Sequence, residues 1–341
     1  MKQNFKITGT PETIDISGDG SYIIMGTYEG SFQIYGLEEK KLLFKTKIKG
    51  TRSHLPIKNQ GISFDNRYFA FSCLFKVFIV DFHSKEIIKE IDYSQNDERQ
   101  SSISFCFFNT QNKIAIPNGG QLLIYDIEKE NMDTISLPQY AGQTNQIAIN
   151  TDDTVIAYKS RSESFEDKLY LIDLKKKQPN KTIPLPYPQS RGNQLYMCCL
   201  KFISEQQLVV LRKGIGFSYF DITSGKEIKT ITWGDLGFRS LHDYDCSRIS
   251  DDGKYLLIRK EMPNRQGQDI YDIDEWIINL PEGKEYVIYD TGQKKIIHTF
   301  THDVSPANFH IETSLLAYIK TDYSGEKTQR TLVIETFSSQ K

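Results

Sequence analysis

The chain has 341 residues, a hydrophobic fraction of 38% and a formal net charge of −2 at pH 7. This hydrophobic fraction is enough for a packed core and too high for a disordered chain. The near-neutral charge, without a long basic run, argues against a nucleic-acid-binding protein. The most apolar stretch, residues 69–82, is interrupted by Lys76 and Asp81, so no segment is long enough to span a membrane.

The N-terminus and the cysteines indicate a compartment. Residues 1–10 are polar and lack the apolar segment of a signal peptide, so we expect a soluble protein of the cytoplasm. The odd number of scattered cysteines favours reduced thiols in a core over a disulfide framework. They are Cys73, Cys106, Cys198, Cys199 and Cys246.

The composition predicts an all-β fold. The sequence contains 41 Ile but only 7 Ala, together with 20 Phe and 19 Tyr. β-Branched and aromatic residues favour strands, whereas alanine is the best helix former. A protein with many helices would not avoid alanine to this extent.

A short apolar strand followed by an acidic residue recurs along the chain, as in Ile79–Phe82, where Asp81 is the acidic residue. The first copy has glycine in the acidic position. The seven positions, here called the acidic slots, are Gly36, Asp81, Asp126, Asp173, Asp221, Asp290 and Glu335. Successive slots are 45, 45, 47, 48, 69 and 45 residues apart. This period indicates a repeat protein.

Each repeat contains further strands. A turn such as Ser17–Tyr22 precedes the slot, and its Gly and Asp residues suit a tight hairpin. An alternating strand such as Ile14–Ile16 comes before the turn, and another such as Leu42–Lys47 follows the slot. Each repeat therefore predicts four antiparallel strands, here called a to d.

Seven repeats of four strands predict a seven-bladed β-propeller. Over its whole length the chain resembles the WD40-type propeller family. No copy has the Trp-Asp dipeptide at the end of strand c, because Tyr-Asp, Val-Asp, Ile-Asp and Phe-Asp stand there, and the Gly-His pair before strand a is also missing. The repeats are equally similar to more general propellers outside the strict family.

The sequence after Glu335 leaves no room for a strand d in the seventh blade, so residues 3–8 are expected to supply it and close the ring. We expect a single propeller domain over residues 1–341. The expected blades, in order, span residues 13–47, 60–91, 101–137, 145–185, 197–232, 245–300 and 305–335.

No linear motif for catalysis or metal binding stands out. Cys198 and Cys199 are adjacent in a strand and point to opposite faces, and His298 and His302 would lie about 13 Å apart along a strand. We therefore predict no catalytic residue, metal or cofactor. An axial-channel site assembled from several blades would leave no linear motif, so an enzyme or small-molecule binder remains the alternative.

Three insertions between strands b and c interrupt the repeats, at residues 160–168, 260–284 and 321–329 of blades 4, 6 and 7. Such loops open on one face of a propeller, together with the connections between blades. The proline-containing connection 184–194 lies on the same face. Insertions in a repeat map to loops, where function concentrates.

The largest insertion carries a helix signature, with Asp272 as the N-cap, Glu275 at the third position and Pro281 at the end. The apolar residues on one predicted face are Ile273, Trp276, Ile277 and Leu280. This face either packs back onto the propeller rim or remains available to a partner. The acidic residues around it do not match a calcium-binding loop and indicate solvated charge.

We interpret the chain as a non-enzymatic protein-interaction scaffold that binds through the face carrying these insertions, for example as a subunit of a multi-protein complex. Its expected partners are proteins, with no nucleic acid and no membrane. The candidate partner-binding residues are Arg161, Phe165, Arg265, Tyr271, Asp272, Trp276 and Ile277.

Overall fold

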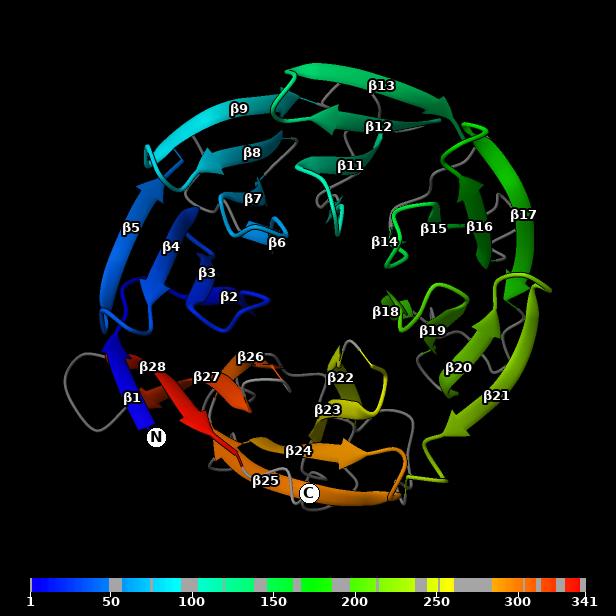
Figure 1. Ribbon diagram of the computed structural model, residues 1–341. Coiled ribbons are helices and arrows are strands. Elements are labelled where there is room, and N and C mark those ends of the chain that lie inside the picture. The colour runs from blue at the N-terminus through cyan, green and yellow to red at the C-terminus, as the bar shows by residue number, and fades with distance from the viewer. Residues whose placement is uncertain are drawn as a thin grey trace, which may run out of the picture.

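The computed structural model describes residues 2–48, 57–73, 76–92, 104–118, 120–137, 146–161, 167–185, 197–212, 215–236, 244–250, 252–260, 284–302, 304–310, 314–322 and 329–337. These residues form seven four-stranded antiparallel sheets arranged as a ring (Figure 1). The fold is a seven-bladed β-propeller, which confirms the predicted fold class. Within the described part of the chain, no helix is long and apolar enough to cross a membrane.

The strands of each blade follow one another in the chain, except in the last blade. Blade 1 comprises β2 (Pro11–Ile16), β3 (Tyr22–Thr27), β4 (Ser31–Gly36) and β5 (Lys41–Lys47). Blade 2 comprises β6 (Ile57–Ile62), β7 (Tyr68–Cys73), β8 (Lys76–Asp81) and β9 (Glu86–Asp92). Blade 3 comprises β10 (Cys106–Phe107), β11 (Lys113–Asn118), β12 (Gln121–Asp126) and β13 (Asn131–Ser136). Blade 4 comprises β14 (Ile147–Ile149), β15 (Val155–Arg161), β16 (Asp167–Asp173) and β17 (Gln178–Leu185).

The remaining blades complete the ring. Blade 5 comprises β18 (Met197–Phe202), β19 (Gln207–Arg212), β20 (Gly216–Asp221) and β21 (Lys226–Thr232). Blade 6 comprises β22 (Tyr244–Ile249), β23 (Tyr255–Lys260), β24 (Lys284–Asp290) and β25 (Lys295–His302). Blade 7 comprises β26 (Val304–His310), β27 (Leu315–Asp322), β28 (Gln329–Thr336) and β1 (Lys2–Lys6).

The N-terminal strand closes the ring, as the sequence predicts. Strand β1 pairs antiparallel with β28 as the outer strand of blade 7. Its side chain Phe5 is buried in a cluster that also contains Tyr35 of blade 1 and Leu332 of blade 7. The first strand of the chain therefore joins the first and the last blade.

The core is divided among the interfaces between neighbouring blades. Seven clusters of buried apolar residues each combine side chains of two adjacent blades. In one of them, Phe32 of blade 1 stacks on Phe71 of blade 2 with ring centroids 4.5 Å apart. Each blade is therefore stabilised mainly by its two neighbours, as in other repeat proteins.

The acidic slots have a local structural role. Asp81 ends strand c of blade 2, and its Oδ1 accepts the backbone N–H groups of His83 and Ser84, at 2.8 and 3.2 Å. Asp173 does the same in blade 4. The residue four positions after each of the first six slots has a positive φ, as Lys85 does at 60°. The slot aspartates of blades 2 to 6 thus accept hydrogen bonds from their own c–d turns and help to fix them.

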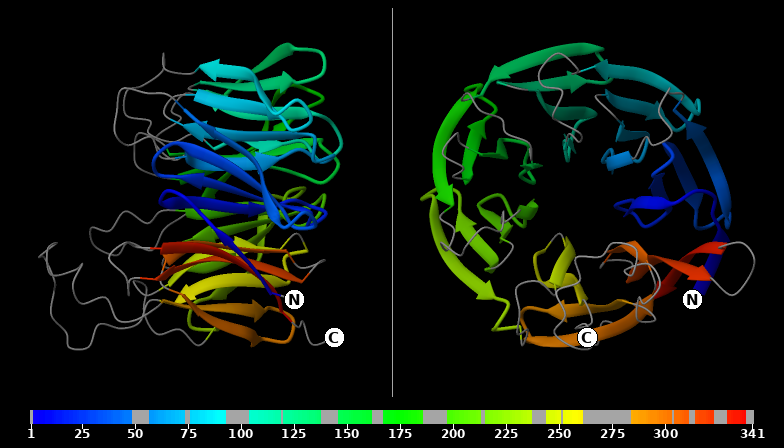
Figure 2. Two further views of the ribbon diagram at one scale, coloured as in Figure 1. Left: turned by 90° about the vertical axis from the view of Figure 1, so that its left-hand side faces the viewer. Right: turned by 180° about the vertical axis from the view of Figure 1, so that it is seen from behind.

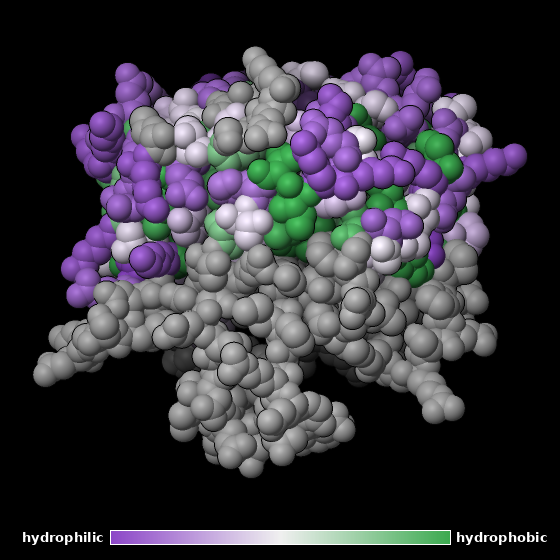
Figure 3. All heavy atoms as spheres, turned by 90° about the horizontal axis from the view of Figure 1, so that it is seen from below, coloured by the Kyte–Doolittle hydropathy of each residue, from purple (hydrophilic) through white to green (hydrophobic). Residues whose placement is uncertain are grey.

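The ring has two faces. The a–b and c–d turns lie on the face toward the viewer in Figure 1, here called the turn face, and the edge-on view shows them at one side of the ring (Figure 2). Strands b and d end, and strands a and c begin, at the opposite face (Figure 2). Seen from below, the outer side of the ring shows apolar residues between hydrophilic ones (Figure 3), as expected for outer strands whose side chains are only partly covered by the neighbouring blades.

The insertions coincide with a change in strand length. Strand c begins six residues before the acidic slot in blades 4, 6 and 7, and five residues before it in blades 1, 2, 3 and 5. The segments that follow strand b in the first group are 162–166, 261–283 and 323–328, and they lie outside the described residues. The predicted helix at 272–281 is among them.

Candidate functional site

A hydrogen-bonded turn between β6 and β7 forms the centre of the candidate site. Ser63 Oγ donates a hydrogen bond to Asp65 Oδ1 at 2.7 Å and accepts one from the backbone N–H of Tyr68 at 2.9 Å. The N–H of Arg67 donates to the same carboxylate oxygen at 3.0 Å. Asn66 adopts a φ of 58°, which asparagine tolerates better than most residues. The turn is therefore fixed by its own side chains.

The same arrangement occurs in other blades. Ser17 and Asp19 in blade 1, and Ser250 and Asp252 in blade 6, make the equivalent hydrogen bonds. In each of these two turns a glycine adopts the positive φ. The Ser-x-Asp spacing in the sequence is thus a signature of the a–b turn.

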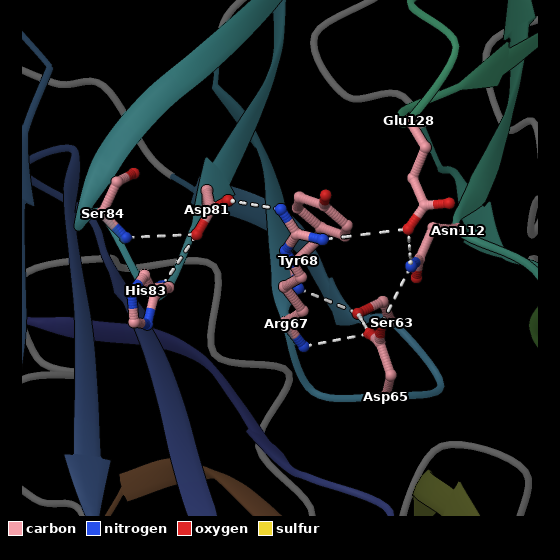
Figure 4. Close-up of polar contacts among 9 residues, drawn as sticks. All are labelled: Ser63, Asp65, Arg67, Tyr68, Asp81, His83, Ser84, Asn112 and Glu128. Atoms are coloured by element: carbon pink, nitrogen blue, oxygen red, sulfur yellow. Dashed lines mark hydrogen bonds and ion pairs between the residues drawn. The ribbon is translucent and has the colours of Figure 1, made fainter.

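A polar network connects this turn of blade 2 to blade 3 (Figure 4). Asn112, only 9% exposed, donates through Nδ2 to Asp65 Oδ2 at 2.9 Å and to Glu128 Oε1 at 3.0 Å. The guanidinium group of Arg67 lies 3.4 Å from Asp81 Oδ2 and 3.8 Å from Glu128 Oε1. The Asn112 amide and the Arg67 guanidinium group thus bring the carboxylates of Asp65, Asp81 and Glu128 together.

The carboxylate of Asp65 is stabilised in its charged form. Burial alone would raise its pKa, but hydrogen bonds from Ser63, Asn112 and the Arg67 N–H outweigh this effect and lower the pKa. The Arg67 guanidinium also lies over the ring of Tyr68, 4.8 Å from its centroid. The Asp65 carboxylate is therefore charged at neutral pH, and its hydrogen bond from Asn112 ties the turn to blade 3.

A second polar contact connects blades 3 and 4. The carboxylate of Asp153, in the a–b turn of blade 4, accepts the backbone N–H groups of Asn109 and Thr110 at 2.7 and 2.8 Å. Asn109 Nδ2 donates to Asp153 Oδ1 and to the carbonyl oxygen of Asn150. The a–b turn of blade 3 is thus tied to blade 4 as the turn of blade 2 is tied to blade 3.

Between these fixed turns, a cavity of about 320 Å³ opens beside the innermost strands of blades 1 to 3. Four of its lining residues are phenylalanines: Phe64, which is 51% exposed, the partly buried Phe105 and Phe107, and the buried Phe108. A Cβ atom on Gly61 would lie 3.2 Å from Phe105 and 3.3 Å from Phe107. Glycine at this position therefore gives the two rings the space they occupy.

A second cavity, of about 410 Å³, lies between blades 4 and 5. It has a polar lining of Thr151, Ser204, Glu205, Gln206, Gln207 and Asp221. The two cavities differ in character, because only the cavity of blades 1 to 3 combines aromatic surface with polar groups.

The partner-binding residues predicted from the sequence are not brought together in the described residues. Arg161 is placed by its backbone only, at the end of β15, where it pairs in register with Asp167. The other six residues, Phe165, Arg265, Tyr271, Asp272, Trp276 and Ile277, lie outside the described residues. Their assignment to a partner site remains a prediction.

The histidine pair and the cysteine pair considered from the sequence each lie within a single strand. His298 and His302 both belong to β25, and Cys198 and Cys199 both belong to β18. Among the described residues, no group of three or more His, Cys, Asp or Glu side chains could hold a metal ion. Burial raises the pKa of the Cys73 thiol to about 11.

Sequence reasoning missed both the aromatic cavity and the contacts between the turns of neighbouring blades. These contacts join residues about one repeat apart, such as Asn109 with Asp153 and Asn112 with Asp65. A search for complementary polar residues one repeat apart in the a–b turns could have found them. Phe64 carries a weaker signal, because it is an aromatic residue within a turn motif.

Comparison with known proteins agrees on the fold and gives no family. No protein-family model matches the chain, and no curated protein sequence matches it. Among solved structures, the β-propeller domain of Cps50 (Swd1) from Myceliophteria thermophila is similar, with a TM-score of 0.65 and 13% sequence identity. The match covers 99% of this chain and 100% of that chain. At this identity the likeness shows the propeller fold alone.

Proposed function

We propose that this chain is a non-catalytic scaffold that binds a protein partner through the face formed by the b–c and d–a connections. The observation that carries the proposal is where the long b–c segments interrupt the repeat. The repeat keeps its strands and turns in all blades, while its three longest b–c segments fall in blades 4, 6 and 7 on one face. A ring of constant blades with variable loops on one face suits recognition.

The extended strands of these blades support the proposal. In blade 4 the pairing of β15 with β16 continues to Arg161 and Asp167, and in blade 7 the pairing of β27 with β28 continues to Asp322 and Gln329. A strand end that is hydrogen-bonded to its neighbour fixes the point from which the following segment starts. The segments 162–166 and 323–328 therefore start from ordered hairpins.

Blade 6 carries the largest of these segments, residues 261–283, between β23 and β24. It contains Arg265, Tyr271 and Trp276, and these residue types dominate binding energies at protein interfaces. We expect this segment to supply the main contacts, with Arg161 and Phe165 of blade 4 at the periphery.

The test compares three proteins as bait in quantitative affinity capture from the native host. They are the full chain, a variant in which a short Gly-Asn turn replaces residues 261–283, and the control Ile228→Ala, which alters an exposed residue of β21. The partner found is then purified and titrated against each bait by calorimetry. We expect the replacement to abolish binding and the control to retain it.

Thermal unfolding of all three proteins distinguishes lost binding from lost folding. Because the other blades are stabilised by their neighbours, the replacement variant should still unfold cooperatively. Equal affinity of the replacement variant and the full chain for the purified partner would contradict the proposed surface.

A further inference from the structure

We propose that two copies of this chain associate through β25, the outer strand of blade 6, by antiparallel pairing of the two strands over His298–His302. This is a second interaction surface on the outer side of the ring, whereas the function proposed above uses the b–c segments. It does not depend on residues 261–283. The proposal rests on the open edge of β25, on the charges that the other outer strands carry, and on the symmetry of an antiparallel pair.

The outer strand of each blade has an edge that faces away from its own sheet. In blade 6 the strand order is β22, β23, β24 and β25, so within the described part of the chain β25 pairs with β24 alone. Alternate residues of such a strand turn their backbone N–H and C=O groups away from the sheet. An edge strand is therefore a template for a further strand, unless its side chains prevent the pairing.

A β-bulge divides β25 into two parts. Ile288 of β24 is opposite His298 and Tyr289 is opposite Ile296, so Ile297 is the extra residue. A bulge disrupts the ladder and bends the strand, so the regular edge of β25 is the segment after it, His298–His302. Register shifts of the same kind occur in β5, β9, β17 and β21. The segment after the bulge is thus the part of an outer strand that is best placed to pair with another chain.

Of the seven described outer strands, only β25 has a regular edge without a Lys, Arg, Asp, Glu or Pro residue. Charged side chains and proline are the features by which proteins keep edge strands from pairing. The corresponding segments of the other blades, whole strands where no register shift occurs, all contain at least one. They are Phe44–Lys47, Lys89–Asp92, Asn131–Ser136, Lys181–Leu185, Lys229–Thr232 and Lys2–Lys6.

The edge of β25 is held in place before it pairs. Phe300, at the middle of the segment, is only 7% exposed, and its ring centroid lies 5.3 Å from that of Tyr286 and 5.2 Å from that of Tyr318 in blade 7. Thr299, beside it, is exposed. Little conformational entropy is therefore lost on pairing. β25 lies at the bottom of the ring in Figure 1, so its side of the ring faces the viewer in Figure 3, where apolar residues are visible between hydrophilic ones.

A second copy of the chain fits this edge by symmetry and by charge. Two identical strands that pair antiparallel are related by a two-fold axis, so each supplies the donors and acceptors that the other needs over the same residues. Residues 298–302 offer no counter-charge to a charged strand, and a second copy brings an uncharged strand of equal length. Pairing centred on Phe300 leaves Lys295 beyond the paired segment, and the two lysines then lie at opposite ends of the pair. Self-pairing of β5 would instead bring four lysines into one short ladder, two from the segment Phe44–Lys47 of each copy.

The length of the edge sets the strength of the association. One pair of short strands buries less than the roughly 1,200 Å² at which stable interfaces begin. We therefore expect a weak dimer with a dissociation constant of about 10–500 μM.

The test measures the mass of the full chain by sedimentation equilibrium, over concentrations from about 5 to 500 μM. We expect the data to fit a monomer–dimer equilibrium. Backbone hydrogen exchange at residues 298–302 should slow as the concentration rises, because the outward N–H groups become hydrogen-bonded in the dimer.

Two charge variants locate the interface. In the pair centred on Phe300, residue 299 lies diagonally across from residue 299 of the second copy, about 7–8 Å away. Thr299→Lys and Thr299→Glu therefore bring like charges together, and each should raise the dissociation constant by about tenfold or more. An equal mixture of the two variants should associate again, because Lys then faces Glu.

Thr182→Lys is the matched control. Thr182 is an exposed threonine of β17 and, like Thr299, is the second residue after the bulge of its strand. This variant should dimerise as the unchanged chain does. Thermal unfolding verifies that all variants are folded.

Four results would overturn the proposal. The first is a full chain that stays monomeric over the whole concentration range, and the second is unchanged dimerisation of Thr299→Lys. The third is a mixture of the Lys and Glu variants that does not associate, which would show that the two strands do not face each other. The fourth is growth beyond the dimer, which a closed two-fold pair does not allow. Each result leaves the scaffold function of the b–c segments untouched.

Discussion

The ammonium group of Lys2 lies 3.5 Å from a carboxylate oxygen of Glu335, in register across the pairing of β1 with β28. Glu335 occupies the acidic slot of blade 7. In other blades an aspartate in this slot accepts backbone N–H groups of its own c–d turn, whereas Glu335 reaches the strand that closes the ring. Its other oxygen is 4.0 Å from Nε2 of His298 in blade 6. The slot of the last blade thus contacts both the closing strand and the preceding blade.

Removal of the closing strand should destabilise the whole ring. Deletion of residues 1–10 removes Phe5 and Ile7, which are 7% and 6% exposed, and uncovers the edge of β28. Each buried side chain of this size contributes about 1.5–3 kcal/mol, so the free energy of unfolding should fall by about 3–6 kcal/mol. Urea unfolding followed by circular dichroism measures this loss.

The control for this deletion is Lys2→Ala. The Lys2 side chain is 58% exposed, and exposed ion pairs contribute about 1 kcal/mol or less. If the urea curve of the deletion variant overlays that of the full chain, closure by β1 contributes nothing to stability.

The contact between the turns of blades 2 and 3 predicts a second loss of stability. Asn112→Ala removes the donor that Asp65 and Glu128 share, and it leaves their two carboxylates facing each other. We expect the free energy of unfolding to fall by about 1–2 kcal/mol. Asn131→Ala, an exposed position in β13, should change it by less than about 0.5 kcal/mol. Equal effects of the two substitutions would show that the network does not stabilise the ring.

The sequence predicted the parts of the fold that repeat. The recurring apolar strand with its acidic residue identified the slots, and the structure explains the aspartates, because each slot aspartate accepts hydrogen bonds from a turn of constant length that ends in a residue of positive φ. The closing strand followed from the missing strand d after Glu335. Both inferences rest on local hydrogen bonding and on the need to cover a sheet edge.

The candidate site could not be predicted in the same way. Phe64, Phe105 and Phe107 come from two blades, and their proximity depends on how far each blade is turned about the ring axis. The space for the rings also depends on Gly61, whose role appears only when its neighbours are known. A sequence pattern gives the strands and their faces, but it does not give which side chains meet across a blade interface.

Acid should weaken the ring through its turn carboxylates. Those with a pKa below the ordinary value of 3.8 include Asp19, Asp65, Asp126, Asp173, Asp221 and Asp252. At Asp65 burial alone would raise the pKa, but the hydrogen bonds to the carboxylate outweigh burial and lower it. At Asp173 the hydrogen bond from the Lys176 N–H is the largest cause of the lowered pKa. Because the pKa is lower in the folded state, each group stabilises the fold above its ordinary pKa.

This stabilisation is lost as the pH falls through the lowered pKa values of the folded chain. The urea midpoint should therefore stay nearly constant from about pH 7 to 5 and decrease steeply below about pH 4. In Asp65→Asn the urea midpoint should fall less between neutral and acidic pH than in the full chain. One of the aspartates with a lowered pKa is then missing and no longer titrates. A midpoint that does not change between pH 5 and 3 would contradict this account.

The c–d turns predict that glycine substitutions at neighbouring positions change the free energy of unfolding in opposite directions. Lys85 adopts a φ of 60°, which costs a non-glycine residue about 1–2 kcal/mol, and its backbone N–H donates to the carbonyl oxygen of Asp81. Glycine relieves this cost but loses about 0.5–1 kcal/mol of chain entropy. Lys85→Gly should therefore increase the free energy of unfolding by up to about 1 kcal/mol, and Lys85→Val should decrease it by about 1 kcal/mol.

The matched control is Glu86→Gly, one residue further along, at the start of β9. Glu86 is exposed and not among the residues of positive φ, so glycine there brings only the entropic cost and should lower the free energy of unfolding by about 0.5–1 kcal/mol. Blade 5 already has glycine at the equivalent position, Gly225, with a φ of 73°. Gly225→Val should accordingly destabilise the chain by at least as much as Lys85→Val. Equilibrium urea unfolding of the four variants measures these differences, and destabilisation by Lys85→Gly would show that the left-handed turn is not strained.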